Sequence, residues 1–393
     1  MKIRLERDVL AEAVQWAARS LPTRPSVPIL AGLLLRTGGG EEGAESVVLS
    51  SFDYETSTQV HARATVTDEG QALVSGRLLA DICRSLPNKP VDISAVDSRM
   101  ELICGSARFT LQTLPVADYP NLPTMPEQTG TIASDEFARA VSQVVVAAGR
   151  DELLPVFTGV RMEIDGETVS LLATDRYRMA LKELTWSPAN PSAGGAALVP
   201  AKVLADTARS MTAGENVSIS LSAASQGDGL IGFQGTGAGG ERETTTRLLD
   251  GEFPKVRHLM SIQPQLTVRG NTAEIIDAAK RVALVAERNT PLRMLIGDGS
   301  ITLEAATGDQ AQASEALEAT VDLHGAAEPS LDAAGFNPNY LLDALGALDA
   351  PYVDFAFTAP GKPCLLTGLA ELDGEPQTDY RHVIMLMRLP ATR

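Results

Sequence analysis

Two short sequence patterns, each typical of a helix, recur three times along this chain of 393 residues, and the repetition constrains its architecture more than any other feature. The first pattern, an acidic helix start, occupies residues 5–10, 132–137 and 268–273. The second, an apolar helix with basic residues, occupies residues 77–86 and 202–211, with a looser copy at 340–348. In each third, the second pattern follows the first after an interval of 65 to 68 residues. Because this period is far longer than a solenoid repeat, it predicts three copies of one domain.

Two proline-rich stretches divide the chain, at residues 120–126 and 253–264. Proline interrupts both helices and sheet ladders, so these stretches predict connectors. The predicted domains are residues 1–125, 126–255 and 256–393, each of ordinary domain size.

Each third is predicted to be α+β, with two helices packed on antiparallel sheets. Apolar residues at helical spacing predict first helices at residues 8–19, 135–148 and 272–286, with Ser134 and Asn271 as N-caps. Strands are expected at residues 29–36 and 157–164, and the last strand at residues 381–389.

The formal net charge of −17 argues against general binding of nucleic acid. It leaves room for a local basic lining, because a net charge is a sum over the whole surface. The charged N-terminus does not resemble a secretory signal, and the apolar runs are too short to cross a bilayer. The three cysteines are widely spaced and are expected to be buried thiols. These features predict a cytoplasmic protein.

No motif in the sequence supports an enzyme active site, a metal site or a cofactor site. Residues 235–240 fit G-x-G-x-x-G, but a charged, β-branched run follows where a dinucleotide site needs a helix, so a hairpin is expected. The four histidines lack metal-ligand spacing. Asp175 could be catalytic, but its position between two predicted strands favours a turn.

Basic residues recur on equivalent helices. Arg77 and Arg84 are seven residues apart and therefore share a helical face, and Lys202 and Arg209 repeat that spacing. An ordinary solvated face and a shared anionic partner explain this pattern about equally well. The apolar, methionine-containing end at residues 383–389 is typical of a last core strand or of the edge of a peptide pocket.

Several longer motifs resemble the bacterial DNA polymerase III beta subunits, the beta sliding clamps. They are Arg-Pro-Ser-Val-Pro-Ile-Leu at 24–30, Asp-Ile-Cys-Arg-Ser-Leu-Pro at 81–87, Phe-Thr-Leu at 109–111, Leu-Pro at 114–115, Asp-Tyr-Pro-Asn-Leu at 118–122, Ala-Thr-Asp at 173–175, Gly-Glu-Phe-Pro at 251–254 and Met-Leu-Met-Arg-Leu at 385–389. The resemblance covers essentially the whole chain. The abundance of glycine and alanine resembles clamps of high-GC Gram-positive bacteria.

The resemblance implies three DNA-clamp domains per chain and a ring-shaped, head-to-tail homodimer. Such a ring encircles double-stranded DNA without sequence preference and has no catalysis and no cofactor of its own. It tethers the DNA polymerase III alpha subunit, and it binds the clamp loader and other proteins that carry a clamp-binding motif. An acidic exterior with a basic hole would reconcile DNA binding with the net charge.

The resemblance also implies roles for individual residues. Positions that face DNA in the family are matched by Arg24, Arg77, Arg84, Arg139, Arg150 and Lys202. Positions of the partner-peptide pocket are matched by Phe157, Thr174, Arg176, Tyr177, Arg178, Met179, Pro254, His258, Leu259, Val383, Met385, Leu386, Met387, Arg388 and Leu389. Positions of the dimer interface are matched by Phe109, Leu284 and Val285.

Two departures from the family pattern lie at the end of the chain. Leu386 stands where the family usually has proline, and residues 390–393 extend past the usual end. They suggest the hypothesis of a divergent second clamp, tolerant of a clamp-binding inhibitor and so linked to antibiotic resistance. The competing readings are a repeat-domain enzyme acting on an anionic metabolite and a non-replicative protein-binding scaffold of the same fold.

Overall fold

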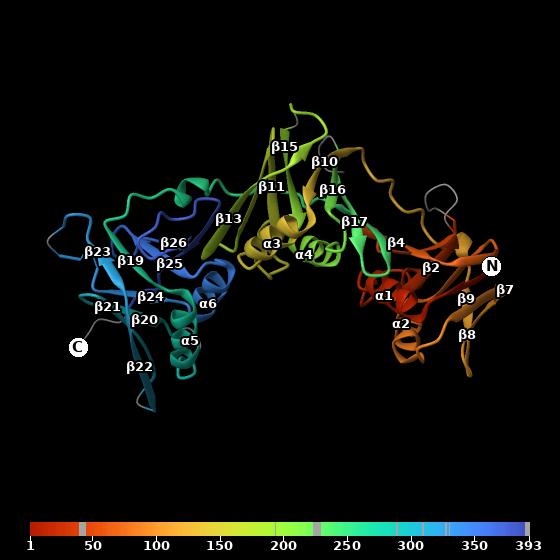
Figure 1. Ribbon diagram of the computed structural model, residues 1–393, viewed down its shortest axis with the longest axis horizontal. Helices are drawn as coiled ribbons and strands as arrows, with labels where there is room; N and C mark the ends of the chain where they lie inside the picture. The colour runs from red at the N-terminus through yellow and green to blue at the C-terminus, as the bar shows by residue number, and fades with distance from the viewer. Residues whose placement is uncertain are drawn as a thin grey trace. The chain divides into compact units, whose positions relative to one another are not determined.

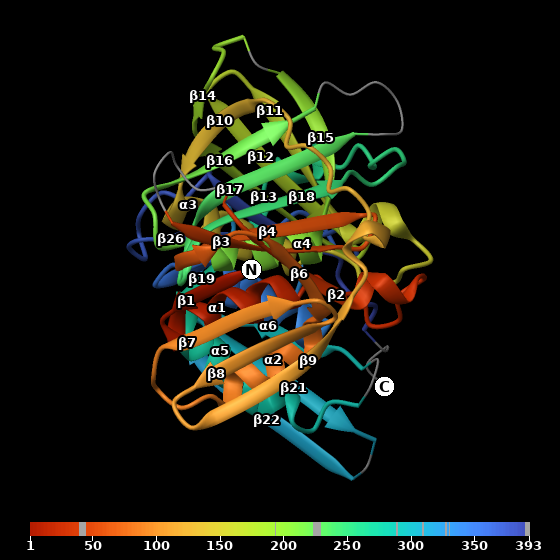
Figure 2. The ribbon, with the colours of Figure 1, turned by 90° about the vertical axis from the view of Figure 1, so that its right-hand side faces the viewer.

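The computed structural model describes residues 1–389 apart from 39–44, 193, 223–228, 288–289, 309, 327 and 330. The C-terminal extension at residues 390–393 lies outside the described residues. The chain forms two compact units, shown in Figures 1 and 2. Unit 1 comprises Met1–Ala138, Trp186–Ala193 and Lys202–Leu248, and unit 2 comprises Arg139–Thr185, Gly194–Ala201 and Leu249–Arg393. The middle third of the sequence therefore contributes to both units.

Unit 1 is built on a fourteen-stranded sheet whose paired strands are antiparallel. Their order is β14-β10-β16-β17-β18-β4-β3-β2-β6-β9-β8-β7-β1-β5. The strands are β1 (Lys2–Leu5), β2 (Gly32–Thr37), β3 (Ser46–Phe52), β4 (Thr56–Arg63), β5 (Thr65–Asp68), β6 (Gln71–Ser75), β7 (Val91–Val96), β8 (Arg99–Cys104), β9 (Ala107–Leu114), β10 (Gln128–Ala133), β14 (Ser187–Pro188), β16 (Asn216–Leu221), β17 (Leu230–Gly237) and β18 (Gly240–Arg247). The pairing of β18 with β4 joins strands from two different thirds of the sequence.

Helices α1 (Arg7–Ala18) and α2 (Gly76–Ser85) pack against each other, and α1 also contacts β3 and β4 (Figure 1). Leu10, Val14 and Ala17 of α1 are fully buried, at the spacing that places them on one face. α3 (Ser134–Val145) and α4 (Ala201–Ser210) are the equivalent helices of the middle third. Each of these helices presents its apolar side to a core and leaves its charged side exposed.

Unit 2 contains a nine-stranded and a four-stranded antiparallel sheet. The larger has the order β15-β11-β12-β13-β27-β26-β25-β19-β23, and the smaller β22-β21-β20-β24. The strands are β11 (Gly159–Asp165), β12 (Thr168–Thr174), β13 (Arg178–Thr185), β15 (Gly194–Pro200), β19 (Leu266–Asn271), β20 (Leu292–Ile296), β21 (Ser300–Thr307), β22 (Ala311–Glu318), β23 (Thr320–Asp322), β24 (Ala333–Phe336), β25 (Tyr352–Phe357), β26 (Cys364–Leu369) and β27 (Tyr380–Ile384). Helices α5 (Thr272–Ala283) and α6 (Pro338–Ala347) pack together on these sheets. The α+β prediction is confirmed.

The three predicted first helices are present, but those expected to reach residues 148 and 286 end at Val145 and Ala283. Three predicted strands also need correction. Short 3₁₀ helices at Pro28–Ala31 and Pro155–Thr158 replace the first residues of the strands expected at 29–36 and 157–164, because proline favours the start of a helical turn. The last strand ends at Ile384, and residues 385–389 follow without regular secondary structure.

Two capping predictions have different outcomes. Asn271 caps α5 by accepting a hydrogen bond from the backbone N–H of Glu274. The Ser134 prediction is wrong, because α3 begins at Ser134 itself and the buried Ser134 hydroxyl has no hydrogen-bond partner among the described residues.

The hairpin and cysteine predictions are confirmed. Gly237 pairs with Gly240 across the turn that joins β17 and β18, so the glycine-rich motif forms a hairpin. Cys83, Cys104 and Cys364 are all buried free thiols.

Candidate functional site

A rigid turn between β12 and β13 positions most of the predicted pocket residues. Asp175 Oδ1 accepts the backbone N–H groups of Tyr177 and Arg178, both at 3.0 Å. The Thr174 hydroxyl donates to the Arg178 carbonyl at 2.7 Å and accepts the Arg176 N–H at 3.1 Å. These bonds hold Arg176 at a φ of 81°, a left-handed conformation that is uncommon outside glycine. Asp175 therefore forms a turn, as predicted.

Arg178 connects this turn to helix α6 through two ion pairs. Its side chain is only 8% exposed, and it bonds Asp175 Oδ2 at 3.0 Å and Asp343 Oδ2 at 2.6 Å. The guanidinium carbon also lies 4.3 Å from the centre of the Tyr340 ring, within cation–π distance. Burial, followed by the charge of Asp175, raises the pKa of Tyr340, so this hydroxyl stays protonated. Arg178 is thus a structural support of the site.

A cavity of about 570 Å³ opens beside the turn. The predicted pocket residues Phe157, Arg176, Tyr177 and Arg178 line it, together with Arg150, which was predicted to face DNA. The Arg176 guanidinium lies 5.6 Å from the centre of the Phe157 ring and 5.8 Å from that of Tyr177. The cavity therefore offers aromatic surface beside both arginine and aspartate side chains, since Asp151, Asp175 and Asp343 also line it.

An apolar cluster lies under this part of unit 2. Its buried members are Leu172, Met179, Leu181, Leu198, Phe253, Met260 and Val383, and its half-buried members are Val156, Leu249, Val256, Leu259, Leu365 and Met385. Met179, Val383, Leu259 and Met385 were predicted, whereas Leu172 and Val256 were missed. The pairing of Leu172 with Leu181 across β12 and β13 explains why both join the cluster. An alternating strand pattern was the only signal in the sequence that could have found them.

Pro254 and His258 line a separate cavity of about 610 Å³, together with Leu172, Phe253 and Val256. Its rim is charged and was not predicted from the sequence. Arg257 bonds Glu163 at 2.8 Å and Glu183 at 2.9 Å. Although burial opposes it, hydrogen bonds from Arg161 and Arg257 hold the pKa of Glu163 below its usual range. Of the predicted pocket residues, four line the first cavity, and Pro254 and His258 line the second. The apolar cluster contributes lining residues to the second cavity but not to the first.

The end of the chain runs along this site. The Met385 N–H donates to the Tyr177 carbonyl, and the Met387 N–H donates to the Gly335 carbonyl, both at 2.8 Å. Leu386, between them, is half-buried. Arg388 is exposed, and Leu389 packs so closely on Gly335 that a side chain at position 335 would meet it. Backbone hydrogen bonds therefore hold residues 385–389 against Tyr177 and Gly335, and the part of this segment in a peptide pocket stays a prediction.

The six cations predicted to face DNA are all exposed. In unit 1, the Arg77 Nη2 donates to the Pro22 carbonyl at 3.1 Å, next to the loop that carries Arg24. Arg84 pairs with Asp81 at 3.3 Å, and Lys202 pairs with Asp206 at 3.5 Å, both on the surface where such pairs are weak. Arg139 and Arg150 belong to unit 2. Each of these charges is accessible to an anionic partner.

The predicted interface residues lie near strand edges that lack a neighbour. Phe109 is in β9, which pairs with β8 along residues 107–112 but with β6 only at Leu114 and Thr113. In unit 2, β22 is the outer strand of its sheet, and Leu284 beyond α5 is 83% exposed. Val285 is half-buried and accepts a hydrogen bond from the Thr307 hydroxyl. Open edges and an exposed leucine favour association with another chain.

Neither a metal site nor a membrane-spanning helix is found in the described part of the chain. Histidine, cysteine, aspartate and glutamate side chains form no group there that could hold a metal ion. None of the helices described has the length and apolar composition that crossing a bilayer requires.

Comparison with known proteins assigns this chain to a family. The chain matches the DNA polymerase III beta subunit in three consecutive parts: the N-terminal domain over residues 1–123, the central domain over 131–255 and the C-terminal domain over 259–388.

Individual relatives match over almost their whole length. The chain is 52% identical over 389 residues to the beta sliding clamp of Streptomyces coelicolor, which covers 99% of this chain and 100% of that one. It is 39% identical over 388 residues to the beta sliding clamp homolog GriR of Streptomyces muensis, covering 99% of each. A crystal structure of the Pseudomonas aeruginosa sliding clamp bound to griselimycin matches with a TM-score of 0.84 at 26% identity, over 99% of this chain and 100% of that one. The Streptomyces matches agree with the predicted resemblance to clamps of high-GC Gram-positive bacteria. The chain therefore belongs to the DNA polymerase III beta subunit family, the beta sliding clamps.

Proposed function

We propose that this protein is a processivity clamp for DNA replication. Two copies close head to tail into a ring around double-stranded DNA and tether DNA polymerase III, its clamp loader and other DNA-processing proteins. The observation that carries the proposal is the match to all three domains of the family in consecutive order. The proposed clamp domains are residues 1–125, 126–255 and 256–393. The protein acts in the cytoplasm and performs no catalysis of its own.

The partner-peptide pocket is proposed at the two cavities of unit 2. Its floor is apolar, its walls carry Arg176 stacked on Phe157, and its edge is the ordered segment at residues 385–389. Such a groove suits a short peptide that inserts leucine or phenylalanine anchors and places a polar group near Arg176. The exposed and half-buried residues named from the resemblance are proposed here as contacts of that peptide, and the buried ones, Thr174, Arg178, Met179 and Val383, as the support beneath them.

The six exposed cations are proposed as contacts to DNA phosphates. Contacts of this kind carry no sequence information, and each one that is lost lowers the salt dependence of binding. A topological link makes high affinity unnecessary, which fits a chain whose net charge is −17.

Dimerisation is proposed through the open edges of β9 and β22. Pairing of two edge strands would satisfy their backbone groups and cover Phe109 and Leu284. Since β9 and β22 are different strands, their pairing would be a heterologous, head-to-tail contact; Glu315 on β22 is already bonded to Arg281 at 2.9 Å.

A reshaped partner-peptide pocket is proposed as a specialised feature of this protein, in keeping with the hypothesis of a divergent second clamp. Leu386 replaces the usual proline in the wall of the pocket, and relatives include the clamp homolog GriR and a clamp crystallised with griselimycin. Titrating a clamp-binding peptide and a clamp-binding inhibitor against this protein and Leu386→Pro tests the idea. A different affinity in the proline variant is expected, and equal affinities would remove the case for a reshaped pocket.

Retention on circular DNA tests the main proposal. The protein is loaded onto nicked circles with its clamp loader and ATP, and half of the sample is then linearised. We expect retention on circles and loss from linear DNA. Equal retention on both would mean ordinary electrostatic binding. No retention, with a control clamp loaded by the same loader, would favour a non-replicative scaffold.

A further inference from the structure

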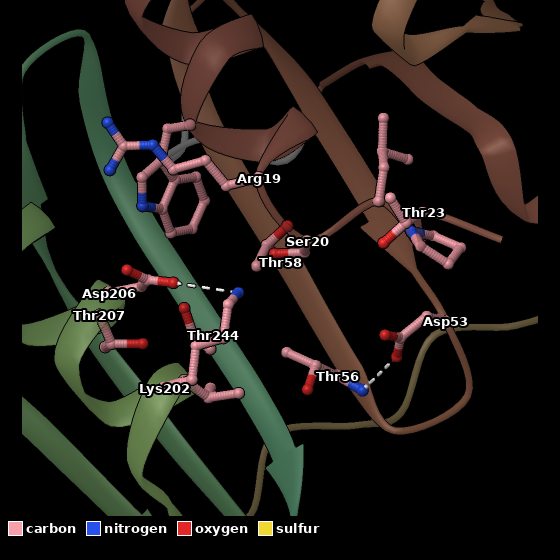
Figure 3. Close-up of a pocket in the computed structure, with 14 residues that line it drawn as sticks. Arg19, Ser20, Thr23, Asp53, Thr56, Thr58, Lys202, Asp206, Thr207 and Thr244 are labelled. Carbon is pink, nitrogen blue, oxygen red and sulfur yellow. Dashed lines mark hydrogen bonds and ion pairs between the residues drawn. The ribbon is translucent and has the colours of Figure 1, made fainter. Parts of the chain in front are cut away.

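Two cavities of unit 1 lie on opposite faces of its large sheet. The smaller, of about 270 Å³, is lined in part by Lys202, which is already proposed to contact DNA (Figure 3). The larger has a volume of about 700 Å³. Thr58 of β4 lines the smaller cavity, whereas Gln59 and His61 of the same strand line the larger. Because successive side chains of a strand point to opposite faces, the larger cavity lies on the face of the sheet away from Lys202.

The connector after β9 covers the larger cavity. Tyr119 of this connector is only 8% exposed and belongs to an apolar cluster with Leu34, Phe52 and Leu73 of the sheet. Leu122 is half-buried, and it lines the cavity together with Tyr119 and Leu34. The cavity therefore receives apolar side chains both from the sheet and from the connector. Its volume lies within the range of about 300–1,000 Å³ that is typical of ligand pockets.

Unit 2 repeats this arrangement at the cavity that contains Pro254 and His258. In each unit an aromatic residue followed by proline, at 119–120 and at 253–254, lines a cavity with residues of two neighbouring strands. The strands are β2 and β3 in unit 1 and β11 and β12 in unit 2, and a short 3₁₀ helix that begins with proline precedes β2 and β11. The repeated domain therefore builds the same kind of cavity twice.

The two cavities differ in charge. β2 and β11 both begin with glycine, and four residues later Arg36 occupies the position that Glu163 occupies in unit 2. Arg36 is exposed, lines the cavity of unit 1 and forms no ion pair with a described residue. None of the described lining residues is an aspartate or glutamate, although the chain has 50 of them. The cavity of unit 1 therefore favours an anionic ligand over a cationic one.

The sheet also supplies a hydroxyl that is available to a ligand. Ser50 lines the cavity and is 5% exposed, and its hydroxyl keeps some accessible surface but has no hydrogen-bond partner among the described residues. Glu243 does not line the cavity; Gln59 donates to it at 3.4 Å, and His61 Nε2 lies 3.9 Å from its Oε1. A ligand group that bonds Ser50 is favoured, because a mostly buried polar group without a partner costs free energy.

We propose that the larger cavity of unit 1 is a second peptide site, which takes a short acidic segment of a partner protein with one apolar anchor. The anchor packs on Leu34 and Leu122, a neighbouring carboxylate pairs with Arg36, and the Ser50 hydroxyl bonds the peptide backbone. The volume suits a few side chains and not a folded domain. The inference goes beyond the proposed function, because it involves neither DNA nor the pocket of unit 2.

Ligand-observed NMR titrations of the full chain test the charge selection. The probes are the acetylated and amidated peptides Gly-Glu-Leu-Glu-Gly and Gly-Gln-Leu-Gln-Gly, which have nearly the same shape and differ in charge. The acidic peptide should bind about threefold more tightly or better. Equal affinities, or no binding of the acidic peptide, would overturn the inference. Sodium isovalerate supplies an apolar group and a carboxylate without a peptide backbone; if it binds as tightly as the acidic peptide, the ligand is a small organic acid and the peptide assignment is overturned.

Two single-charge variants locate the site. Arg36→Gln removes the positive charge, and Asn121→Asp adds a negative charge of the same shape at an exposed lining residue. Each should weaken binding of the acidic peptide by about threefold to fivefold and leave the neutral peptide unchanged. The matched control, Arg63→Gln, removes an exposed charge of β4 outside the cavity and should change neither affinity. Equal losses in Arg63→Gln and Arg36→Gln would mean that net charge alone decides, which contradicts a site at this cavity.

Arg176→Gln separates this site from the pocket of unit 2. If Arg176→Gln weakens the acidic peptide and Arg36→Gln does not, the peptide binds in unit 2 and the inference is overturned. Retention on DNA circles is measured in parallel, and Arg36→Gln should be retained like the parent protein. Retention without binding of the acidic peptide overturns this inference alone, and peptide binding without retention counts against the clamp proposal alone.

Discussion

Weak acid should destabilise this protein through one buried histidine, His382 in strand β27. The Tyr380 hydroxyl donates to the Gln143 carbonyl at 3.0 Å and lies 2.9 Å from His382 Nδ1, so this hydrogen-bond network assigns the ring proton to Nδ1. His382 Nε2 is buried and has no hydrogen-bond partner among the described residues. Burial, and then the charge of Arg178, lower the pKa of His382 to about 3.

The size of the effect follows from proton linkage. In the unfolded chain His382 takes up a proton near the ordinary histidine pKa of about 6.5, whereas in the folded protein the His382 ring stays neutral down to about pH 3. Between these values the unfolded state binds one more proton, so the free energy of unfolding falls by about 1.4 kcal/mol per pH unit of acidification. The contribution of His382 is complete above pH 6.5 and is lost as the pH falls. Between pH 7.5 and 5.5 the loss amounts to about 1.4 kcal/mol.

Urea unfolding at pH 7.5 and 5.5 measures this loss. His382→Asn keeps an N–H that can reach Tyr380 and does not titrate in this range. Between the two pH values, its free energy of unfolding should therefore fall by about 1.4 kcal/mol less than that of the wild type. The matched control, His324→Asn, changes an exposed histidine of the same unit and should keep the wild-type decrease. The same pH dependence in the wild type and in His382→Asn would refute the reasoning.

Three further substitutions test the turn and the hairpin by urea unfolding. Arg178→Met leaves the carboxylate of Asp175, which is 13% exposed, without its partner, and should cost about 3 kcal/mol; a loss below about 1 kcal/mol would contradict a structural role. Arg176→Gly should be more stable than Arg176→Ala by about 1 kcal/mol, because both lose the guanidinium but only alanine keeps the strain of a positive φ; equal stability would argue against strain there. Gly240→Ala should cost about 2–4 kcal/mol, because its Cβ would lie 1.9 Å from the His61 carbonyl oxygen at a φ of 142°, and a neutral result would mean that the hairpin shifts freely.

Local features of the fold were predictable from the sequence. The helices follow from apolar spacing, and the turn at Asp175 follows from a carboxylate that bonds the backbone two and three residues ahead. Asn271 acts through the same kind of short-range bond. Ser134 shows the limit of this reasoning. It is a residue type that favours the N-cap, but β10 continues to Ala133, and Ser134 is therefore the first residue of the helix itself.

Long-range features could not be read from one sequence. Leu172 and Phe253 are far apart in the chain and meet only because β12 and the connector after β18 contribute to the same core. Arg257 and Glu163 line the same cavity and form an ion pair, and no motif in the sequence records this contact. The Thr244 hydroxyl is buried without a hydrogen-bond partner among the described residues, and this follows from three-dimensional packing, because the sequence around it is an ordinary run of threonines.

The pairing of β4 with β18 also has a consequence for the newborn chain. Thr56 and Thr246, whose hydroxyls bond across this seam, are 190 residues apart. At a translation rate of roughly 5–20 residues per second, β4 waits about 10–40 seconds on the ribosome before its partner is made. Throughout that time it presents an unpaired edge, the feature that invites strands of other chains to pair. During synthesis there is therefore an interval in which the edge of β4 depends on a chaperone for protection, until the middle third emerges and supplies β18.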